Sequence, residues 1–209
     1  MASLSLEDSI ALVKKHGIGF VPSYRAANEK ELEAACSSAA FPLAMKVSSG
    51  QISHKSDAGG VKINIQSLDE ATKVFSLMKE LPGFEYVIVQ PMLRGVEIII
   101  GGKRDVQFGP TVLFGLGGIY VEVFRDYSVG ICPISRKIAV EMMERLKSYP
   151  LLKGIRGQQG ANLEEIVQAI MKASRLMVSE KDVMELDINP LIATPTQVVA
   201  VDARVVTGK

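Results

Sequence analysis

The middle of this chain carries five consecutive stretches with strand character and no helix pattern between them. They are, in order, EYVIVQ, VEIIIGG, VQFGPTVLFGLGG, YVEVF and SVGICPI. Strands joined by short connections pair antiparallel, whereas parallel strands need a longer crossover that is usually a helix. We expect the turn between the second and third stretches at Lys103–Arg104–Asp105. This meander argues against a parallel, doubly wound sheet.

Helix patterns flank the meander on both sides. Ser5, Asn28 and Ser67 each stand as a cap before an apolar stripe, and later stripes begin near Ile138 and Ile166. Three further groups of strands are FPLAMKV with VKINI, then VMELDINPLIA, and finally QVVAVDARV. The alternation predicts an α+β fold of two lobes rather than one continuous layer of parallel strands.

Composition narrows the class of protein. With 209 residues, 47% apolar and 22% charged, the chain is long enough to bury a substantial core, and its formal net charge of +1 argues against a nucleic-acid surface. No segment approaches the roughly 20 apolar residues that span a bilayer, so we expect no membrane partner. Cys36 and Cys132 stand apart from any metal-binding cluster. Isolated cysteines fit a reducing compartment, and we expect the cytoplasm.

Residues 54–60, His-Lys-Ser-Asp-Ala-Gly-Gly, place one of only two histidines beside a flexible turn. Backbone N–H groups near Gly59 and Gly60 are able to form an anion-binding concavity, because glycine lets the backbone approach a phosphate closely. Lys46 adds positive charge nearby in the chain. His54 is able to hydrogen-bond a phosphoryl group or accept it covalently. The alternative is an ordinary loop histidine.

Acidic and amide side chains gather on the last strands. Glu185, Asp187 and Asn189 are spaced two apart and share one face of a strand, and Asp202 is expected on the next strand, facing them. Such oxygen ligands suit Mg²⁺, which takes few protein ligands and completes its shell with water and substrate phosphates. The alternative is a hydrated acidic sheet face.

Six ordered motifs together carry a family resemblance over nearly the whole chain. They are FPLAMKV, SSGQISHKSDAGGVKI, YVIVQPMLRGVEIIIG, RDVQFGPTVLFGLGGIYVEV, ELDINPLI and VVAVDARV. The chain resembles the ATP-grasp (β) subunit of ADP-forming acyl-CoA (acetyl-CoA) synthetases and, more distantly, the β subunit of succinyl-CoA synthetase. The resemblance implies one ATP-grasp domain over 1–209, with a smaller lobe at about 20–90, a larger lobe at about 91–209 and the nucleotide in the cleft between them. The helix over 5–17 is compatible with either lobe.

The resemblance also implies an activity and its partners. Acyl-CoA, ADP and phosphate are interconverted with acid, CoA and ATP, and a phosphohistidine carries the phosphoryl group between subunits. This chain would be a ligase subunit that is active only with a CoA-binding α subunit, in an α2β2 heterotetramer. Mg²⁺ and ADP or ATP are the implied cofactors. His54 matches the histidine that accepts the phosphoryl group.

The nucleotide-binding positions follow from the same resemblance. Lys46 matches a lysine that contacts phosphates, Gln90 and Met92 match the hinge that meets adenine, and Glu97 matches a carboxylate for ribose or metal. Gly117 and Gly118 match a second glycine-rich segment that faces the nucleotide. Asn189 and Asp202 match the two Mg²⁺ ligands.

Two other functions compete with this one. The first is an ATP-grasp module that senses ADP or ATP without turnover, as part of a larger acyltransferase-type assembly. The second is a scaffolding subunit whose role is its interface. The acyl substrate is not encoded in this chain if its pocket lies on the α subunit, and fold alone does not choose between these functions.

Overall fold

The computed structural model describes residues 1–49, 59–118, 125–155, 157 and 159–208. Two compact units contain these residues. Unit 1 comprises Met1–Phe20 and Arg94–Lys209, and unit 2 comprises Val21–Leu93. Each unit combines helices with an antiparallel sheet, as an α+β fold requires. Helix α1 (Leu6–Lys15) belongs to unit 1.

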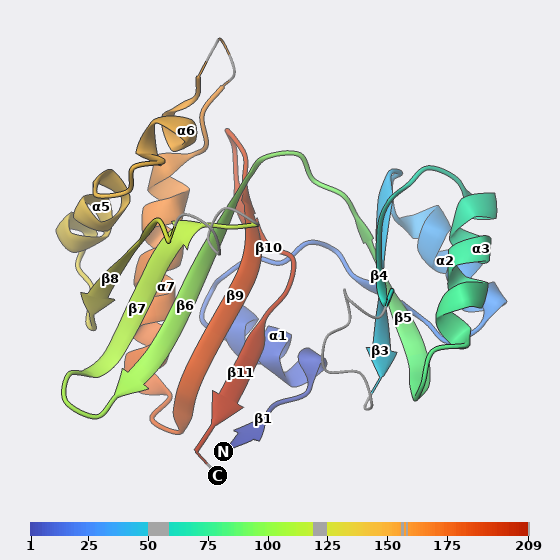
Figure 1. The fold of residues 1–209 in the computed structure, drawn as a ribbon, viewed down its shortest axis with the longest axis horizontal. Coiled ribbons are helices and arrows are strands. Elements are labelled where there is room, and N and C mark those ends of the chain that lie inside the picture. The colour runs from blue at the N-terminus through green and yellow to red at the C-terminus, as the bar shows by residue number, and fades with distance from the viewer. Residues whose placement is uncertain (50–58, 119–124, 156, 158, 209) are drawn as a thin grey trace. The chain divides into compact units, whose positions relative to one another are not determined.

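Unit 1 is built on a seven-stranded sheet (Figure 1). Its order is β1 (Ala2–Ser3), β11 (Arg204–Thr207), β9 (Val183–Ala193), β6 (Val96–Asp105), β7 (Gly109–Leu116) and β8 (Tyr127–Ile131), and β10 (Val198–Ala200) also pairs with β9. All of these ladders are antiparallel. The consecutive antiparallel pairing of β6, β7 and β8 confirms this part of the predicted meander. The first predicted strand, EYVIVQ, instead belongs to β5 (Phe84–Pro91) in the sheet of unit 2, and YVEVF (120–124) lies outside the described residues.

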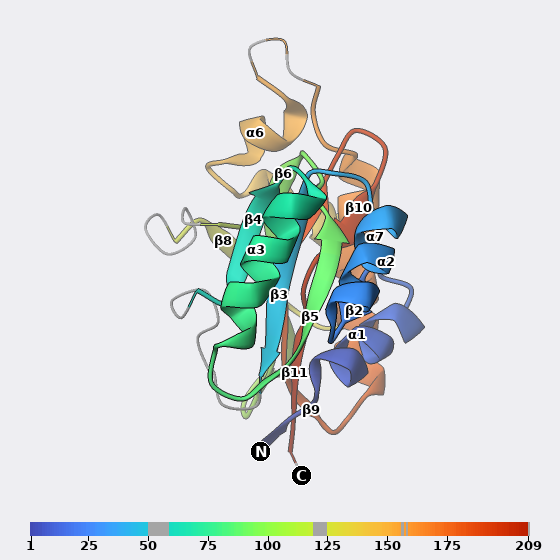
Figure 2. The same cartoon turned by 90° about the vertical axis from the view of Figure 1, so that its right-hand side faces the viewer.

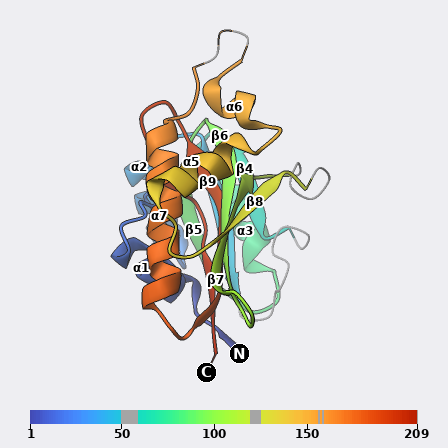
Figure 3. The same ribbon diagram turned by 90° about the vertical axis from the view of Figure 1, so that its left-hand side faces the viewer.

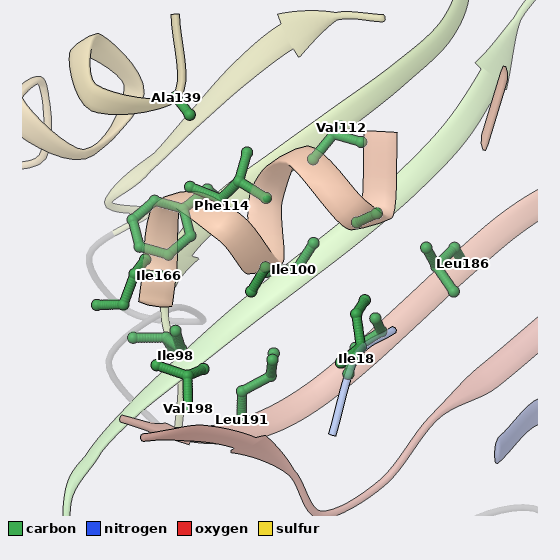
Figure 4. Close-up of a cluster of buried hydrophobic side chains, with 14 of the residues drawn as sticks. Ile18, Ile98, Ile100, Val112, Phe114, Ala139, Ile166, Leu186, Leu191 and Val198 are labelled. Atoms are coloured by element: carbon green, nitrogen blue, oxygen red, sulfur yellow. The ribbon is translucent and has the colours of Figure 1, made fainter. Parts of the chain in front are cut away.

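Helices α1, α5 (Arg136–Glu144) and α7 (Leu163–Ser179) pack against one face of this sheet (Figure 3). The short helix α6 (Tyr149–Lys153) lies beyond the end of the sheet and contributes Leu152 to the same core. Figure 4 shows sheet residues Ile98, Ile100 and Phe114 beside Ile166 of α7, and all four are fully buried. Because side chains alternate along a strand, the neighbours of these residues in β6 and β7 point to the opposite face.

Unit 2 is a four-stranded sheet with two helices on one face (Figure 2). Its order is β2 (Tyr24–Ala26), β5 (Phe84–Pro91), β3 (Leu43–Ser49) and β4 (Val61–Ile65). Helices α2 (Glu29–Ser38) and α3 (Leu68–Lys79) bury apolar faces that include Leu32 and Phe75. The unit therefore has a hydrophobic core of its own.

Helix caps follow the sequence signals closely. The side chains of Ser5, Asn28 and Ser67 accept hydrogen bonds from the backbone N–H three residues later, as N-cap residues do. Each bond satisfies one N–H that the first helical turn leaves without an intrahelical partner. The predicted starts of α1, α2 and α3 are confirmed.

Two strand predictions were wrong in detail. The turn after β6 does not lie at Lys103–Asp105, because these residues pair with Gly109–Thr111 of β7. The turn instead follows Asp105, whose Oδ1 accepts hydrogen bonds from the N–H groups of Gln107 and Phe108. QVVAVDARV is likewise not one strand. It divides into β10 and β11, and Asp202 lies in the connection between them rather than on a strand.

Among the described residues, no helix is both long enough and apolar enough to cross a membrane.

Candidate functional site

A pocket in unit 1 brings together three of the predicted nucleotide-binding residues. It has a volume of about 460 Å³ and is lined by Gly95, Val96, Glu97, Leu116, Gly117, Gly118 and Leu151. Glu97 lies near the start of β6, on the face opposite α7, and its side chain is exposed. Gly117 and Gly118 directly follow β7, the neighbouring strand. The carboxylate and the glycine-rich backbone therefore share one cavity.

Both glycines are needed for this close approach. The Gly117 N–H donates to the Glu97 carbonyl oxygen over 2.7 Å. A Cβ added at Gly117 would lie 3.2 Å from backbone atoms of Glu97, and one added at Gly118 would lie 3.0 Å from Glu97 Oε2. Gly118 also has φ +71°, a left-handed conformation that side chains with a Cβ rarely adopt. Glycine at these two positions leaves room for the Glu97 carboxylate.

Leu151 is a pocket residue that the sequence did not reveal. It belongs to α6, a helix of only five residues, which is too short to produce a readable apolar period. The Tyr-Pro pair at 149–150 is the signal that was available, because proline is favoured at the first helical positions. Leu151 is 40% exposed and contributes an apolar wall to the pocket.

In unit 2, Lys46 lies in β3, an interior strand of the sheet, between Ile88 of β5 and Val61 of β4. Gln90 lies near the end of β5 and is 2% exposed. Its Nε2 donates to Ser23 Oγ over 2.9 Å. The side-chain NH₂ group of Gln90 thus bonds inside unit 2, and the contact of this hinge with adenine through backbone groups stays a prediction.

Two further predicted residues of unit 2 have clear backbone contacts. The Met92 N–H donates to the Pro42 carbonyl oxygen over 2.9 Å, and Met92 Sδ accepts from the Asn64 N–H. The Gly60 carbonyl oxygen accepts from the Val47 N–H over 2.8 Å. Gly59 is exposed and has φ +72°, and a Cβ added there would meet nothing within 4 Å. His54 falls in 50–58, outside the described residues.

The predicted metal ligands lie on adjacent segments of unit 1. Asn189 is exposed on β9. The next residue, Pro190, accepts a hydrogen bond of 2.9 Å at its carbonyl oxygen from the Val201 N–H. This bond joins β9 to the segment that carries Asp202. Asp202 Oδ1 accepts from the Ala203 N–H. The peptide bond between Asn189 and Pro190 is cis. An amide oxygen on β9 and a carboxylate oxygen on the connection between β10 and β11 are thereby available on adjacent segments.

Electrostatics at this place suit a cation. Desolvation raises the pKa of Asp187, the nearby Asp202 carboxylate raises it further, and Arg204 opposes both effects. Arg204 lies opposite Asp187 in the ladder between β11 and β9. A divalent cation stabilises a carboxylate whose charge is disfavoured by burial and by a neighbouring carboxylate. Within the described part of the chain, no group of three or more His, Cys, Asp or Glu residues forms a metal site. The predicted pair fits Mg²⁺ because that ion requires few protein ligands.

Comparison with known proteins places these features in context. A model of the ATP-grasp domain family matches residues 2–207. The β subunit of ADP-forming acetate-CoA ligase I from Pyrococcus furiosus is 41% identical over 204 residues, which cover 93% of this chain and 88% of that subunit. The ADP-forming acetate-CoA ligase I of Archaeoglobus fulgidus is 36% identical, and there the match covers 97% of this chain but 30% of the relative.

Solved structures agree in fold. An acetyl-coenzyme A synthetase 1 from Ca. Korarchaeum cryptofilum, in complex with coenzyme A and Ca-AMPCP, superposes with a TM-score of 0.91 at 38% identity. The match covers 98% of this chain and 93% of that one. In another structure of that enzyme, with Mg-AMPPCP, the phosphohistidine segment points towards the nucleotide-binding site.

Proposed function

Because this chain belongs to the ATP-grasp domain family and to the β subunits of ADP-forming acetate-CoA ligases within it, we propose that it is the nucleotide-binding subunit of an ADP-forming acyl-CoA ligase. The overall reaction converts acyl-CoA, ADP and phosphate into acid, CoA and ATP. The pocket shared by Glu97, Gly117 and Gly118 is the observation that carries this proposal, because it unites on two strands residues assigned to the nucleotide from separate motifs.

The roles that we propose for the residues follow from their chemistry. Glu97 accepts hydrogen bonds from hydroxyl groups of the ribose, and backbone groups of Gly117 and Gly118 approach the nucleotide. Lys46 contributes a positive charge toward the phosphates, and the amides of Gly59 and Gly60 add backbone donors. Gln90 and Met92 meet the adenine edge through the backbone, since the Gln90 side chain already bonds to Ser23.

Phosphoryl transfer requires a donor, and we propose His54. The bond between phosphorus and the imidazole nitrogen of phosphorylated His54 breaks, and a bond forms between that phosphorus and a β-phosphate oxygen of ADP. ATP leaves with the phosphoryl group, and the imidazole returns to its neutral form. Asn189 and Asp202 would hold Mg²⁺, which supplies charge compensation as the phosphoryl group moves.

A partner chain follows from this role. The β-subunit relative is one part of a ligase, and the Archaeoglobus relative extends well beyond the matched region within a single chain. We propose a CoA-binding α subunit and an α2β2 assembly, which native mass spectrometry of the co-expressed subunits would test. Cys36 and Cys132 are free and buried, which supports a reducing compartment, and we place the enzyme in the cytoplasm.

The relay is tested with two histidine variants. The chain is mixed with its α subunit, acetyl-CoA, phosphate and Mg-ADP, and ATP formation is compared between wild type, His54→Ala and the control His16→Gln. His16 is a suitable control because its Nε2 forms a hydrogen bond of 3.0 Å with Glu180 Oε1, and it lies outside the lining of the pocket that contains Glu97. We expect ATP from wild type and His16→Gln but not from His54→Ala, with ADP affinity retained in all three.

Other outcomes separate the competing functions. Equal ATP yield from His54→Ala would refute the phosphohistidine relay. Tight ADP binding without ATP formation by wild type would favour the nucleotide sensor. Stable assembly with the α subunit in the absence of any nucleotide affinity would favour the scaffold.

A further inference from the structure

We propose that α6 forms the nucleoside-binding wall of the pocket that contains Glu97, hereafter the Glu97 pocket. Leu151 contacts the nucleoside part of ADP, and Asp126 positions the helix. This inference rests on the proposed function and assigns two residues beyond it. Leu151 and Leu152 are neighbours in α6 with different environments. Leu152 is fully buried in the core of unit 1, whereas Leu151 is 40% exposed and lines the pocket. One leucine anchors the helix and leaves the other available to a ligand.

The lining of the pocket suits a nucleoside better than a phosphate. Glu97 provides the charged group, and Val96, Leu116 and Leu151 provide apolar surface. A carboxylate accepts hydrogen bonds from sugar hydroxyls but repels a phosphate, and no Lys or Arg is among the described residues that line the cavity. Apolar side chains next to a few polar groups are the usual composition of a small-molecule site. Ribose and base therefore match this cavity, and the phosphates extend out of it.

Asp126 fixes the chain directly before α6. It lies next to β8, and its two carboxylate oxygens accept hydrogen bonds from the N–H groups of Lys147 over 3.0 Å and Ser148 over 2.8 Å. Ser148 is the N-cap residue of α6 but makes no side-chain cap bond. The carboxylate of Asp126 thus holds the backbone at the N-terminal end of α6, where the helix has no side-chain cap of its own. Ser148, at this end, lies three residues before Leu151.

The other end of α6 is held by the backbone. The Ala161 N–H donates to the Leu152 carbonyl oxygen over 2.8 Å, across the loop that leaves the helix. Gly160 approaches so closely that an added Cβ would lie 2.5 Å from backbone atoms of Lys153. With both ends fixed and Leu152 buried, Leu151 is held in place before the ligand arrives, which lowers the entropic cost of binding.

Calorimetric titration of the full-length chain with Mg-ADP tests the proposal. Leu151→Ala should weaken ADP binding about tenfold, because it removes apolar contact that the ligand would bury. Leu151→Met conserves volume and should restore affinity to within about threefold of wild type. Leu77→Ala is the matched control, since Leu77 is a leucine on the surface of α3 with 73% exposure and lies outside the pocket lining. Its ADP affinity should equal that of wild type.

The positioning role of Asp126 is tested by a double-mutant cycle. Asp126→Ala should weaken ADP binding when Leu151 is present and have a much smaller effect in the Leu151→Ala background, because the helix then has no contact residue to position. Losses that simply add on a logarithmic scale would mean that Asp126 acts independently of Leu151, and would overturn its assignment.

Two results overturn the proposal in distinguishable ways. Unchanged ADP affinity in Leu151→Ala, with wild type and Leu77→Ala binding normally, refutes the nucleoside wall and leaves the proposed function intact. Failure of wild type to bind ADP refutes the proposed function together with this inference.

Discussion

Replacing Gly118 with alanine tests whether the backbone geometry of the pocket serves the nucleotide. Gly118 has φ +71°, in the left-handed region, and an added Cβ would lie 3.0 Å from Glu97 Oε2. That oxygen is at the far end of a flexible side chain, so the carboxylate is able to move away. We therefore expect the substitution to displace the group that we assign to the ribose, at a limited cost in stability.

The size of that cost follows from the backbone angle. A residue with a Cβ in the left-handed region costs about 1–2 kcal/mol. The unfolded chain with alanine has less conformational entropy to lose, which returns roughly 0.4–1 kcal/mol. The net loss in the free energy of unfolding is about 1 kcal/mol, or roughly 2–4 °C in Tm for a protein of this size.

Gly109→Ala is a matched control for the strain alone. Gly109 has φ +74° at the turn between β6 and β7, and an added Cβ would meet nothing within 4 Å. Urea unfolding should give similar losses of stability for both variants, and Mg-ADP titration should show weaker binding for Gly118→Ala only. Equal weakening in both variants, or full ADP affinity in Gly118→Ala, would refute the link between this backbone and the nucleotide.

Three further predictions concern stability, pH and metal. Arg104 donates hydrogen bonds to the carbonyl oxygens of Met177 and Glu180 at the end of α7 and of Val183 at the start of β9. Arg104→Ala should therefore lower the unfolding free energy by about 2–4 kcal/mol in urea titrations. Arg145→Ala, which loses an exposed ion pair, should change it by less than about 0.5 kcal/mol. Hydrogen bonds from His16 and Lys15 lower the pKa of Glu180, so this carboxylate stabilises the fold at neutral pH and loses that effect as the pH falls below about 4.5. The urea midpoint of Glu180→Gln should therefore decrease less on acidification than that of wild type. Identical pH profiles of the two proteins would contradict this. Excess Mg²⁺ should raise the Tm of wild type. Asp202→Asn should abolish that increase without lowering the Tm measured in EDTA. If Mg²⁺ raises the Tm of Asp202→Asn as much as that of wild type, Asp202 is not a metal ligand.

The parts of the fold that the sequence predicted are those controlled by local chemistry. Caps at Ser5, Asn28 and Ser67 depend on one side chain and one N–H three residues away, so the pattern is readable in a short window. The turn after β6 was predicted at Lys103–Asp105, whereas in the structure the side chain of Asp105 caps a turn at 106–108, three residues later.

The site was less readable because its geometry depends on contacts between distant segments. Glu97 and Gly118 were assigned by motif, but their proximity comes from the register of β6 and β7. Leu151 was missed because a single exposed leucine in a five-residue helix has no pattern that separates it from a surface residue. Asp126 was missed because its partners are backbone N–H groups, at Lys147 and Ser148, and such contacts leave no trace in residue types.

Strand β9 is irregular directly after Asn189, one of the two predicted metal ligands. Along β9, Ile188 and Leu191 are both buried although they are three residues apart, so strict alternation fails between them. The ladder to β6 shifts its register at this place, between Ile98 and Ile100, and irregularities of this kind redirect side chains near functional sites. Pro190 fits here because it has no N–H to donate to a regular ladder, while its carbonyl oxygen binds the segment of Asp202. Asn189 still follows the alternation that exposes Glu185 and Asp187, and the extra residue after it returns Leu191 to the core. The break in the β9 pairing thus lies directly after Asn189, where the Pro190 carbonyl oxygen joins β9 to the segment that carries Asp202.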